Sequence, residues 1–216
     1  YIGWCEIVSS LHVFNSDGYK RNGALPSGAA LTPIINCIIN HLLFRMCWVD
    51  LFGIEKLHQF NDAVYLIVLG DDNIFAVNDL FPEFTMRSIS NSMQKYGYKY
   101  TSTSKGEVGD MLLLKEISFL KRNFRWEDKL NRYVAPLALG SIFQCLYWTK
   151  KCAESDTITE TCIQLALEEL SLHGEFLFLN YQPSILEESR NKGYNLPKIT
   201  SYLQLLFLVS DRKSTY

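Results

Sequence analysis

The chain has 216 residues, 48% of them hydrophobic, and a formal net charge of −2. This length and apolar content suffice to bury a core in one domain or one and a half. The near-neutral balance excludes a chain that binds nucleic acid through overall positive charge alone.

The charge is unevenly spread along the sequence. From Lys99 to Arg132 there are eight Lys and Arg residues against five Asp and Glu, whereas from Glu154 to Glu188 there are eight acidic residues and no basic ones. We therefore expect a polyanionic partner to lie along the middle of the chain, away from the acidic later segment.

The cysteines and the apolar runs indicate the cellular setting. None of the six cysteines shows Cys-x-x-Cys spacing, so we expect no zinc site, and their apolar surroundings are typical of free thiols in a reducing compartment. Asn40, His41 and Arg45 interrupt the longest apolar run, so we expect no transmembrane segment, and we expect no signal peptide. Because the chain opens at Tyr1 without a methionine, we expect a piece of a longer polyprotein.

The predicted elements alternate between hairpins and helices and then become helical. In chain order they are a hairpin over 12–22, a glycine-flanked loop over 23–28, a helix over 32–49 and a hairpin over 65–77. A helix over 80–96 with Pro82 near its start, a strand over 98–104 and a hairpin over 117–126 follow, and then helices over 141–151, 157–173 and 200–209. This order predicts an α+β domain with a helical appendage.

The central hairpin carries the most specific signal. Apolar runs over 65–69 and 74–77 flank Gly70, Asp71 and Asp72, and Gly70 supplies the positive φ that a tight reversal requires. Adjacent carboxylates repel one another, and a divalent cation such as magnesium would offset that repulsion. The alternative is a solvated turn, since Asp and Gly are also favoured turn residues.

A second polar pattern precedes this hairpin. Thr32, Asn36 and Asn40 fall at i, i+4 and i+8 of the predicted helix, on one face. Spacing leaves two alternatives open: a satisfied polar network in the core, or a polar stripe that faces a nucleotide sugar. In the loop before the helix, Ser27 is either a helix N-cap or part of an amide-rich loop beside phosphate or ribose.

These blocks together resemble the viral RNA-dependent RNA polymerases of picornavirus-like positive-strand RNA viruses. Pro26-Ser27-Gly28-x-x-x-Thr32-x-x-x-Asn36, then Gly70-Asp71-Asp72, then Phe119-Leu120-Lys121-Arg122-x-Phe124 occur in the order of that family's motifs B, C and E. The resemblance implies a right-hand polymerase fold: a partial palm over 1–135, with motif D between motifs C and E, and a helical thumb over 136–216.

The resemblance also implies roles for individual residues. Asp71 would be a ligand of Mg²⁺, or of Mn²⁺ in its place, in a two-metal site, and Asp72 would be a weaker or outer ligand. Asn36 would read the ribose 2′-hydroxyl, which distinguishes RNA from DNA, with Ser27, Gly28 and Thr32 lining the same nucleotide site.

Three basic residues receive roles from the same likeness. Lys105 would approach the triphosphate and protonate the leaving pyrophosphate, and Lys121 and Arg122 would hold the backbone of the priming RNA strand. The alternatives are a solvated loop lysine and an exposed basic pair on a strand.

The sequence departs from the family pattern in three places. Leu69 stands where an aromatic residue is usual before Gly-Asp-Asp, and Ser104 stands where an aspartate often precedes the lysine. The aspartate of motif A has no match, since Asp17 sits in a predicted turn. The chain therefore looks like the C-terminal part of a polymerase, and we expect it to be inactive by itself.

The function implied is template-directed transfer of nucleotides to an RNA 3′ end during viral genome replication. The partners implied are template RNA, a primer that can be linked to a protein, nucleoside triphosphates, and the upstream fingers and motif A of the same polyprotein. The expected location is the host cytoplasm, at membrane-associated replication complexes held by other viral proteins. The rival hypotheses are a reverse transcriptase palm and a non-catalytic remnant that only binds RNA or another protein.

Overall fold

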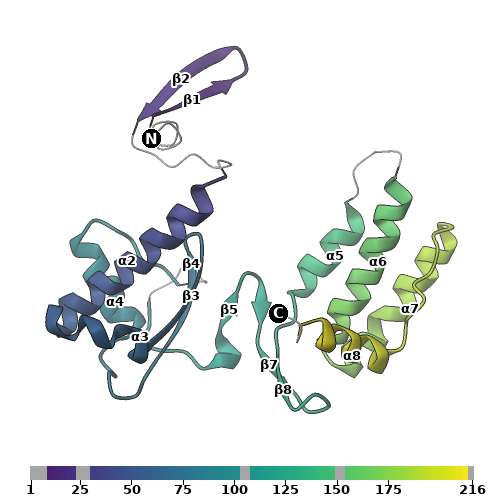
Figure 1. Cartoon of the computed structure of the whole chain (residues 1–216). Helices are drawn as coiled ribbons and strands as arrows, with labels where there is room; N and C mark the ends of the chain where they lie inside the picture. Colours follow the sequence, from purple (N-terminus) through teal and green to yellow (C-terminus); the bar gives the residue numbers. More distant parts are fainter. Residues whose placement is uncertain (1–8, 23–29, 103–107, 149–153, 214–216) are drawn as a thin grey trace. The chain divides into compact units, whose positions relative to one another are not determined.

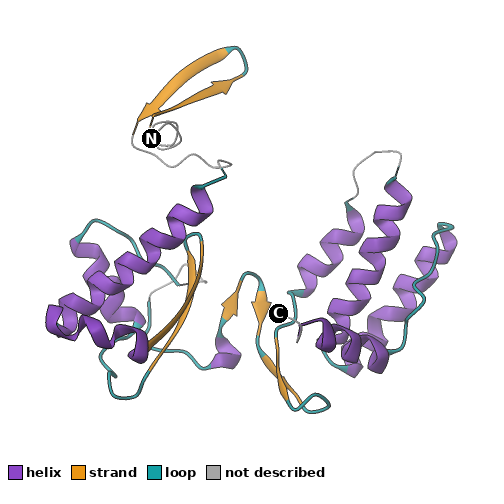
Figure 2. Ribbon diagram, viewed as in Figure 1, coloured by secondary structure: helices purple, strands orange, loops and turns teal. Residues whose placement is uncertain are grey.

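The computed structural model describes residues 9–22, 30–102, 108–148 and 154–213, in which helices alternate with short antiparallel hairpins (Figures 1 and 2). The chain divides into two compact units, residues 1–111 and 112–216. Each sheet in the described residues is a two-stranded antiparallel hairpin. The α+β class predicted from the sequence agrees with this mixture of helices and antiparallel hairpins.

The first unit is built around one long helix and the hairpin that follows it. Its elements are β1 (Ser9–Phe14), β2 (Asp17–Asn22), α2 (Thr32–Phe52), η1 (Ile54–Gln59), α3 (Phe60–Ala63), β3 (Val64–Leu69), β4 (Asp72–Val77) and α4 (Met86–Lys95). The predicted hairpins and the helix starting at residue 32 are therefore confirmed.

Aromatic packing holds helix α2 against its neighbours. Phe44, Trp48 and Phe84 are fully buried, and the Trp48 indole donates a hydrogen bond to the Lys56 carbonyl at 2.9 Å. Burying side chains of this size contributes about 1.5–3 kcal/mol each. The opposite face of the helix leaves apolar side chains half exposed, among them Ile38 at 54%.

By length and composition alone, α2 could cross a membrane. The prediction that no apolar run reaches that length is wrong on this criterion, because Asn40, His41 and Arg45 are too few to lower the mean hydropathy enough. Its buried side chains, however, contact α3, α4 and the β3–β4 hairpin. We interpret α2 as the core helix of this unit.

Two sequence predictions beyond the central hairpin are wrong. The helix expected over 80–96 begins only at Met86, because the Thr85 hydroxyl accepts the Ser88 amide and forms a capping box there. The strand expected over 98–104 is absent across the described residues 98–102. Tyr100 instead turns its ring toward Phe44, with the ring centroids 6.2 Å apart.

The second unit consists of short strands followed by helices. Its elements are η2 (Leu114–Glu116), β5 (Ser118–Phe119), β6 (Arg122–Asn123), β7 (Arg125–Glu127), β8 (Arg132–Val134), α5 (Leu139–Tyr147), α6 (Ser155–Ser171), α7 (Glu175–Asn191) and α8 (Tyr202–Lys213). Strand β5 pairs with β6 and β7 pairs with β8, and an isolated bridge between Arg122 and Leu137 continues the β7–β8 register. Within this stretch, Val134 joins the apolar core of the helices that follow, and Arg122 and Arg125 bind Glu169 and the Leu172 carbonyl of that helical part.

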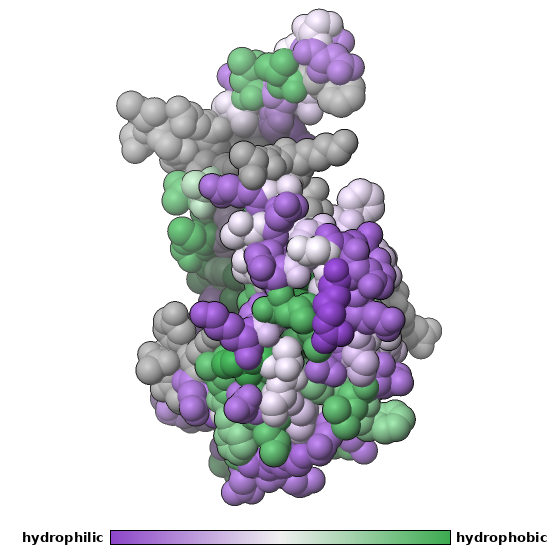
Figure 3. All heavy atoms as spheres, turned by 90° about the vertical axis from the view of Figure 1, so that its right-hand side faces the viewer, coloured by the Kyte–Doolittle hydropathy of each residue, from purple (hydrophilic) through white to green (hydrophobic). Residues whose placement is uncertain are grey.

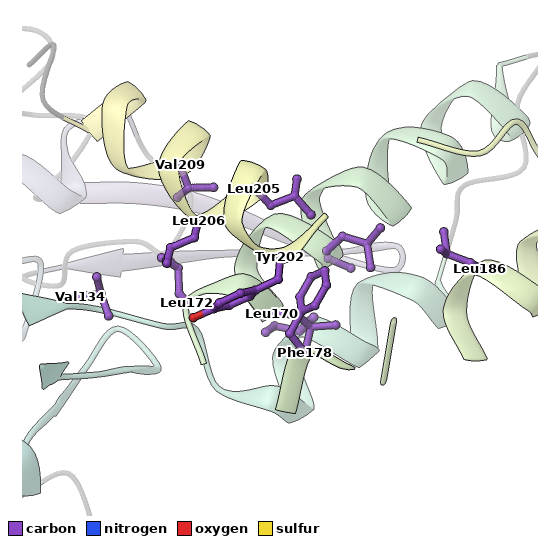
Figure 4. Close-up of a cluster of buried hydrophobic side chains, with 12 residues drawn as sticks. Val134, Leu170, Leu172, Phe178, Leu186, Tyr202, Leu205, Leu206 and Val209 are labelled. Carbon is purple, nitrogen blue, oxygen red and sulfur yellow. The ribbon is translucent and has the colours of Figure 1, made fainter. Parts of the chain in front are cut away.

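The helices of this unit enclose an apolar core. Leu170, Phe178 and Tyr202 come from α6, α7 and α8 and converge in Figure 4. Helix α7 was not predicted, because Pro183 lies inside it and proline ordinarily interrupts a helix. The face in Figure 3 mixes small groups of hydrophilic and hydrophobic residues.

Candidate active site

The carboxylate pair lies at the tip of the β3–β4 hairpin. The register runs from Val64↔Val77 to Leu69↔Asp72, so Gly70 and Asp71 form a two-residue turn and Asp72 opens the return strand. Gly70 has φ +65°, which a residue with a side chain rarely adopts. The positive φ predicted for this glycine is therefore confirmed.

Helix α2 fixes the backbone of this turn from one side (Figure 1). The Gly70 amide donates to the Cys37 sulfur at 3.1 Å. The Asn40 amide donates to the Asp71 carbonyl at 3.0 Å and lies 3.5 Å from the Gly70 carbonyl. These hydrogen bonds involve only backbone atoms of the turn, so the carboxylates of Asp71 and Asp72 do not take part in them.

The Asp71 and Asp72 side chains are exposed and have no hydrogen-bond or ion-pair partner among the described residues. Two unpartnered carboxylates suit a hard cation such as Mg²⁺. The described residues contain no cluster of three or more potential His, Cys, Asp or Glu ligands. The donor set therefore fits an ion whose remaining ligands are water, phosphate or a further carboxylate.

The polar face predicted on α2 divides into two environments. Asn40 is only 7% exposed, and its side-chain oxygen accepts from the Asn73 amide at 3.4 Å, so it belongs to a satisfied core network. Asn36, one turn earlier, is half-buried, and its side chain makes no hydrogen bond among the described residues. Thr32 is half-buried in the first turn of the helix. Of the two asparagines on this face, Asn36 is therefore the one whose side-chain amide is available for a ligand.

Three predicted site residues lie outside the described residues: Ser27, Gly28 and Lys105. Their assignments to the nucleotide and to the leaving pyrophosphate stay predictions. The described neighbour closest in sequence to Lys105 on its N-terminal side is Ser102.

Lys121 and Arg122 belong to the second unit and have different environments. Lys121 is exposed in the β5–β6 turn, where both Leu120 and Lys121 have positive φ. Arg122 donates to both carboxylate oxygens of Glu169, at 2.7 and 2.9 Å, and to the Ala135 carbonyl at 2.7 Å. The guanidinium thus ties β6 to α6. Of these two adjacent cations, Lys121 is the one whose charge is not engaged by a described residue.

Tyr100, which the sequence did not single out, reaches the hairpin from the segment after α4. Its hydroxyl donates to the Asn73 side-chain oxygen at 2.9 Å. Burial raises the pKa of Tyr100 to about 12, so the phenol keeps its proton at neutral pH. Cys37 and Asn73 were not predicted as site residues either. The only sequence signal for them is their position next to Asn36 and to Asp72.

The first unit thus combines an α+β fold with two unpartnered carboxylates on a hairpin turn that a helix holds in place. Comparison with known proteins makes the class specific. The family described as viral RNA-dependent RNA polymerase matches residues 6–181. The chain belongs to this family, and the resemblance inferred from its motifs is confirmed.

Its relatives are polyproteins of RNA viruses. The chain is 32% identical over 179 residues to the replicase polyprotein of Drosophila C virus, covering 80% of the chain and 10% of the relative. It is 33% identical over 199 residues to that of Cricket paralysis virus, with coverages of 88% and 11%. For the genome polyprotein of Human rhinovirus A serotype 89, identity is 32% over 197 residues, with coverages of 89% and 8%. The chain spans about a tenth of the length of these relatives.

Proposed function

We propose that the chain is the part of a viral RNA-directed RNA polymerase that carries the catalytic hairpin and the start of the thumb. The observation that carries this proposal is the pair of unpartnered carboxylates at Asp71 and Asp72 in a chain of this family. Residues 1–135 would form the palm, with motifs B to E, and residues 136–216 the thumb. The family match favours this function over a reverse transcriptase.

In this proposal, Asp71 and Asp72 would hold Mg²⁺ or Mn²⁺ through their carboxylates. When bound, the ions would supply activation of the primer 3′-hydroxyl and neutralisation of charge on pyrophosphate. The unpaired carboxylates keep their lone pairs available, while the hydrogen bond from the Gly70 amide to the Cys37 sulfur and the bond from Asn40 to the Asp71 carbonyl fix the turn. A further carboxylate from the motif A segment would complete the ligand set.

The remaining residues bind and orient the substrates. The free amide of Asn36 would bind the ribose 2′-hydroxyl, with Ser27, Gly28 and Thr32 beside it, and Lys105 would give its proton to pyrophosphate. Lys121 would contact an RNA phosphate as an exposed point charge. The proposed partners are template RNA, a primer that can be protein-linked, nucleoside triphosphates and the upstream fingers, in replication complexes of the host cytoplasm.

The test is an isosteric change at the hairpin turn in the complete polymerase. Asp71→Asn removes one ligand charge and should lower RNA synthesis by more than about a hundredfold, because changes to groups that only support a metal ligand already cost 10–100-fold. Template binding should stay unchanged. The matched control is Asp79→Asn, since Asp79 is exposed just beyond the other end of the same hairpin.

Either of two results would contradict the proposal. Synthesis by Asp71→Asn at the level of Asp79→Asn would remove the carboxylate from catalysis. Equal loss of synthesis and of template binding would assign Asp71 a structural role, and a non-catalytic RNA-binding module would then be the better hypothesis.

A further inference from the structure

The hairpin turn is the end point of a chain of side-chain hydrogen bonds that begins outside the hairpin. The Tyr100 hydroxyl donates to the Asn73 oxygen at 2.9 Å, and the Asn73 amide donates to the Asn40 oxygen at 3.4 Å. The Asn40 amide in turn donates to the Asp71 carbonyl at 3.0 Å. We call Tyr100, Asn73 and Asn40 the relay.

The relay connects three segments that are separate in sequence. Tyr100 follows α4, Asn73 is the second residue of β4, and Asn40 lies in the third turn of α2. In each side-chain amide of the relay, the nitrogen donates in the direction of the turn and the oxygen accepts from the direction of Tyr100. This common direction fixes the orientation of both amide groups, because reversing either one would place two acceptors or two donors against each other.

The relay ends on the backbone of Asp71 itself. The β3–β4 strands already pair with each other through a complete register, so hairpin formation does not require a bond from α2 to the turn. What the bond from Asn40 adds is a fixed position of the turn relative to the helix that carries Asn36. Asn40 is buried, so water does not compete strongly for this bond.

We propose that the relay positions the two carboxylates for metal binding, so that Tyr100 acts on the metal site without touching it. This inference rests on the proposed function, because it assumes that Asp71 and Asp72 hold a divalent cation. Tyr100, Asn73 and Asn40 are positioning residues in this account. Losing one bond lets the turn shift and lowers the affinity of the carboxylates for the ion.

Tyr100→Phe is the sharpest variant, because it removes one oxygen atom and keeps the packing of the ring on Phe44. Its matched control is Tyr98→Phe, since Tyr98 is exposed on the same segment and its hydroxyl has no hydrogen bond among the described residues. Mn²⁺ affinity of the complete polymerase is measured by electron paramagnetic resonance of the free ion. Template RNA affinity and melting temperature are measured on the same samples.

We expect Tyr100→Phe to weaken Mn²⁺ binding about tenfold, the lower end of the range for changes behind a metal ligand, with RNA affinity unchanged. Asn40→Ala should weaken it further, and Asn91→Ala, on the exposed face of α4, should not. Cys37→Ser should retain more affinity than Cys37→Ala, because a hydroxyl can still accept the Gly70 amide.

The outcomes separate the relay from the proposed function. Mn²⁺ affinity of Tyr100→Phe equal to that of Tyr98→Phe, alongside a clear loss in Asp71→Asn, would overturn the relay alone. Unchanged Mn²⁺ affinity in Asp71→Asn would overturn the metal site and the relay with it. A lower melting temperature with parallel losses of Mn²⁺ and RNA binding in Tyr100→Phe would show a purely structural role and would also overturn the relay.

Discussion

Lys121 and Arg122 are adjacent in sequence, yet the structure predicts opposite consequences when each is changed to alanine. Arg122 forms a bidentate ion pair with Glu169, and the two side chains are 32% and 22% exposed, respectively. Exposed pairs contribute at most about 1 kcal/mol, and breaking a fully buried pair costs about 3–5 kcal/mol. Arg122→Ala should therefore destabilise the packing of β6 on α6 by about 2 kcal/mol.

The assay is hydrogen exchange at two backbone amides beside this pair. The Asn123 amide donates to the Pro136 carbonyl, and the Ala138 amide donates to the Lys121 carbonyl. A loss of about 2 kcal/mol in local stability makes these amides exchange roughly 30-fold faster. Lys121→Ala is the control, because its exposed side chain makes no described contact, and exchange should stay within about twofold of the wild type.

The same variants test which residue binds RNA. Lys121→Ala should weaken template binding and reduce the dependence of log affinity on log salt by about one, as expected for the loss of one phosphate contact. Arg122→Ala should leave that slope unchanged under conditions in which it is folded. Unchanged amide exchange in Arg122→Ala together with a reduced salt slope would show that Arg122 binds RNA and does not hold β6 on α6.

Two further predictions concern the first unit. Hydrogen bonds from Ser92 and Tyr96 lower the pKa of Asp50 in the folded state. The carboxylate therefore stabilises the fold above about pH 4, the ordinary pKa of Asp, and this contribution is lost as the pH falls through the lower folded pKa. Urea denaturation between about pH 5 and pH 2 should show a smaller loss of stability for Asp50→Asn than for the wild type, and equal losses would contradict this. Asn36→Ala in the complete polymerase should reduce the preference for ribonucleotides over deoxynucleotides by about tenfold, the value of one hydrogen bond, when competing incorporation rates are measured, whereas an unchanged preference would exclude Asn36 from the ribose site.

The sequence predicts those parts of the fold that depend on local signals. Helix α2 follows from apolar residues at helical spacing, and the β3–β4 hairpin follows from two apolar runs around Gly70. The start of α4 was misplaced because Pro82 and the capping residue Thr85 both offer a beginning, and the capping box at Thr85 determines it.

The contacts that shape the site are not local, and the sequence could not supply them. The Arg122–Glu169 pair joins residues 47 positions apart, and the relay joins Tyr100 to Asn40 through Asn73. The alternation over 98–104 resembled a strand, but Tyr100 packs on Phe44 and uses its hydroxyl on the hairpin. Spacing placed Asn36 and Asn40 on one face, and only the structure shows that one is engaged and the other is free.

In the proposed function, the hairpin of this chain belongs to a polymerase whose metal site is completed by an upstream aspartate. The most direct measurement is magnesium-dependent extension of a primed RNA template by the 216-residue chain and by a longer polypeptide that includes the motif A segment, after both are shown to be folded. We expect extension by the longer polypeptide and none by the 216-residue chain. Steady incorporation by the 216-residue chain, or no extension by the longer folded one, would show that the upstream aspartate does not complete the site.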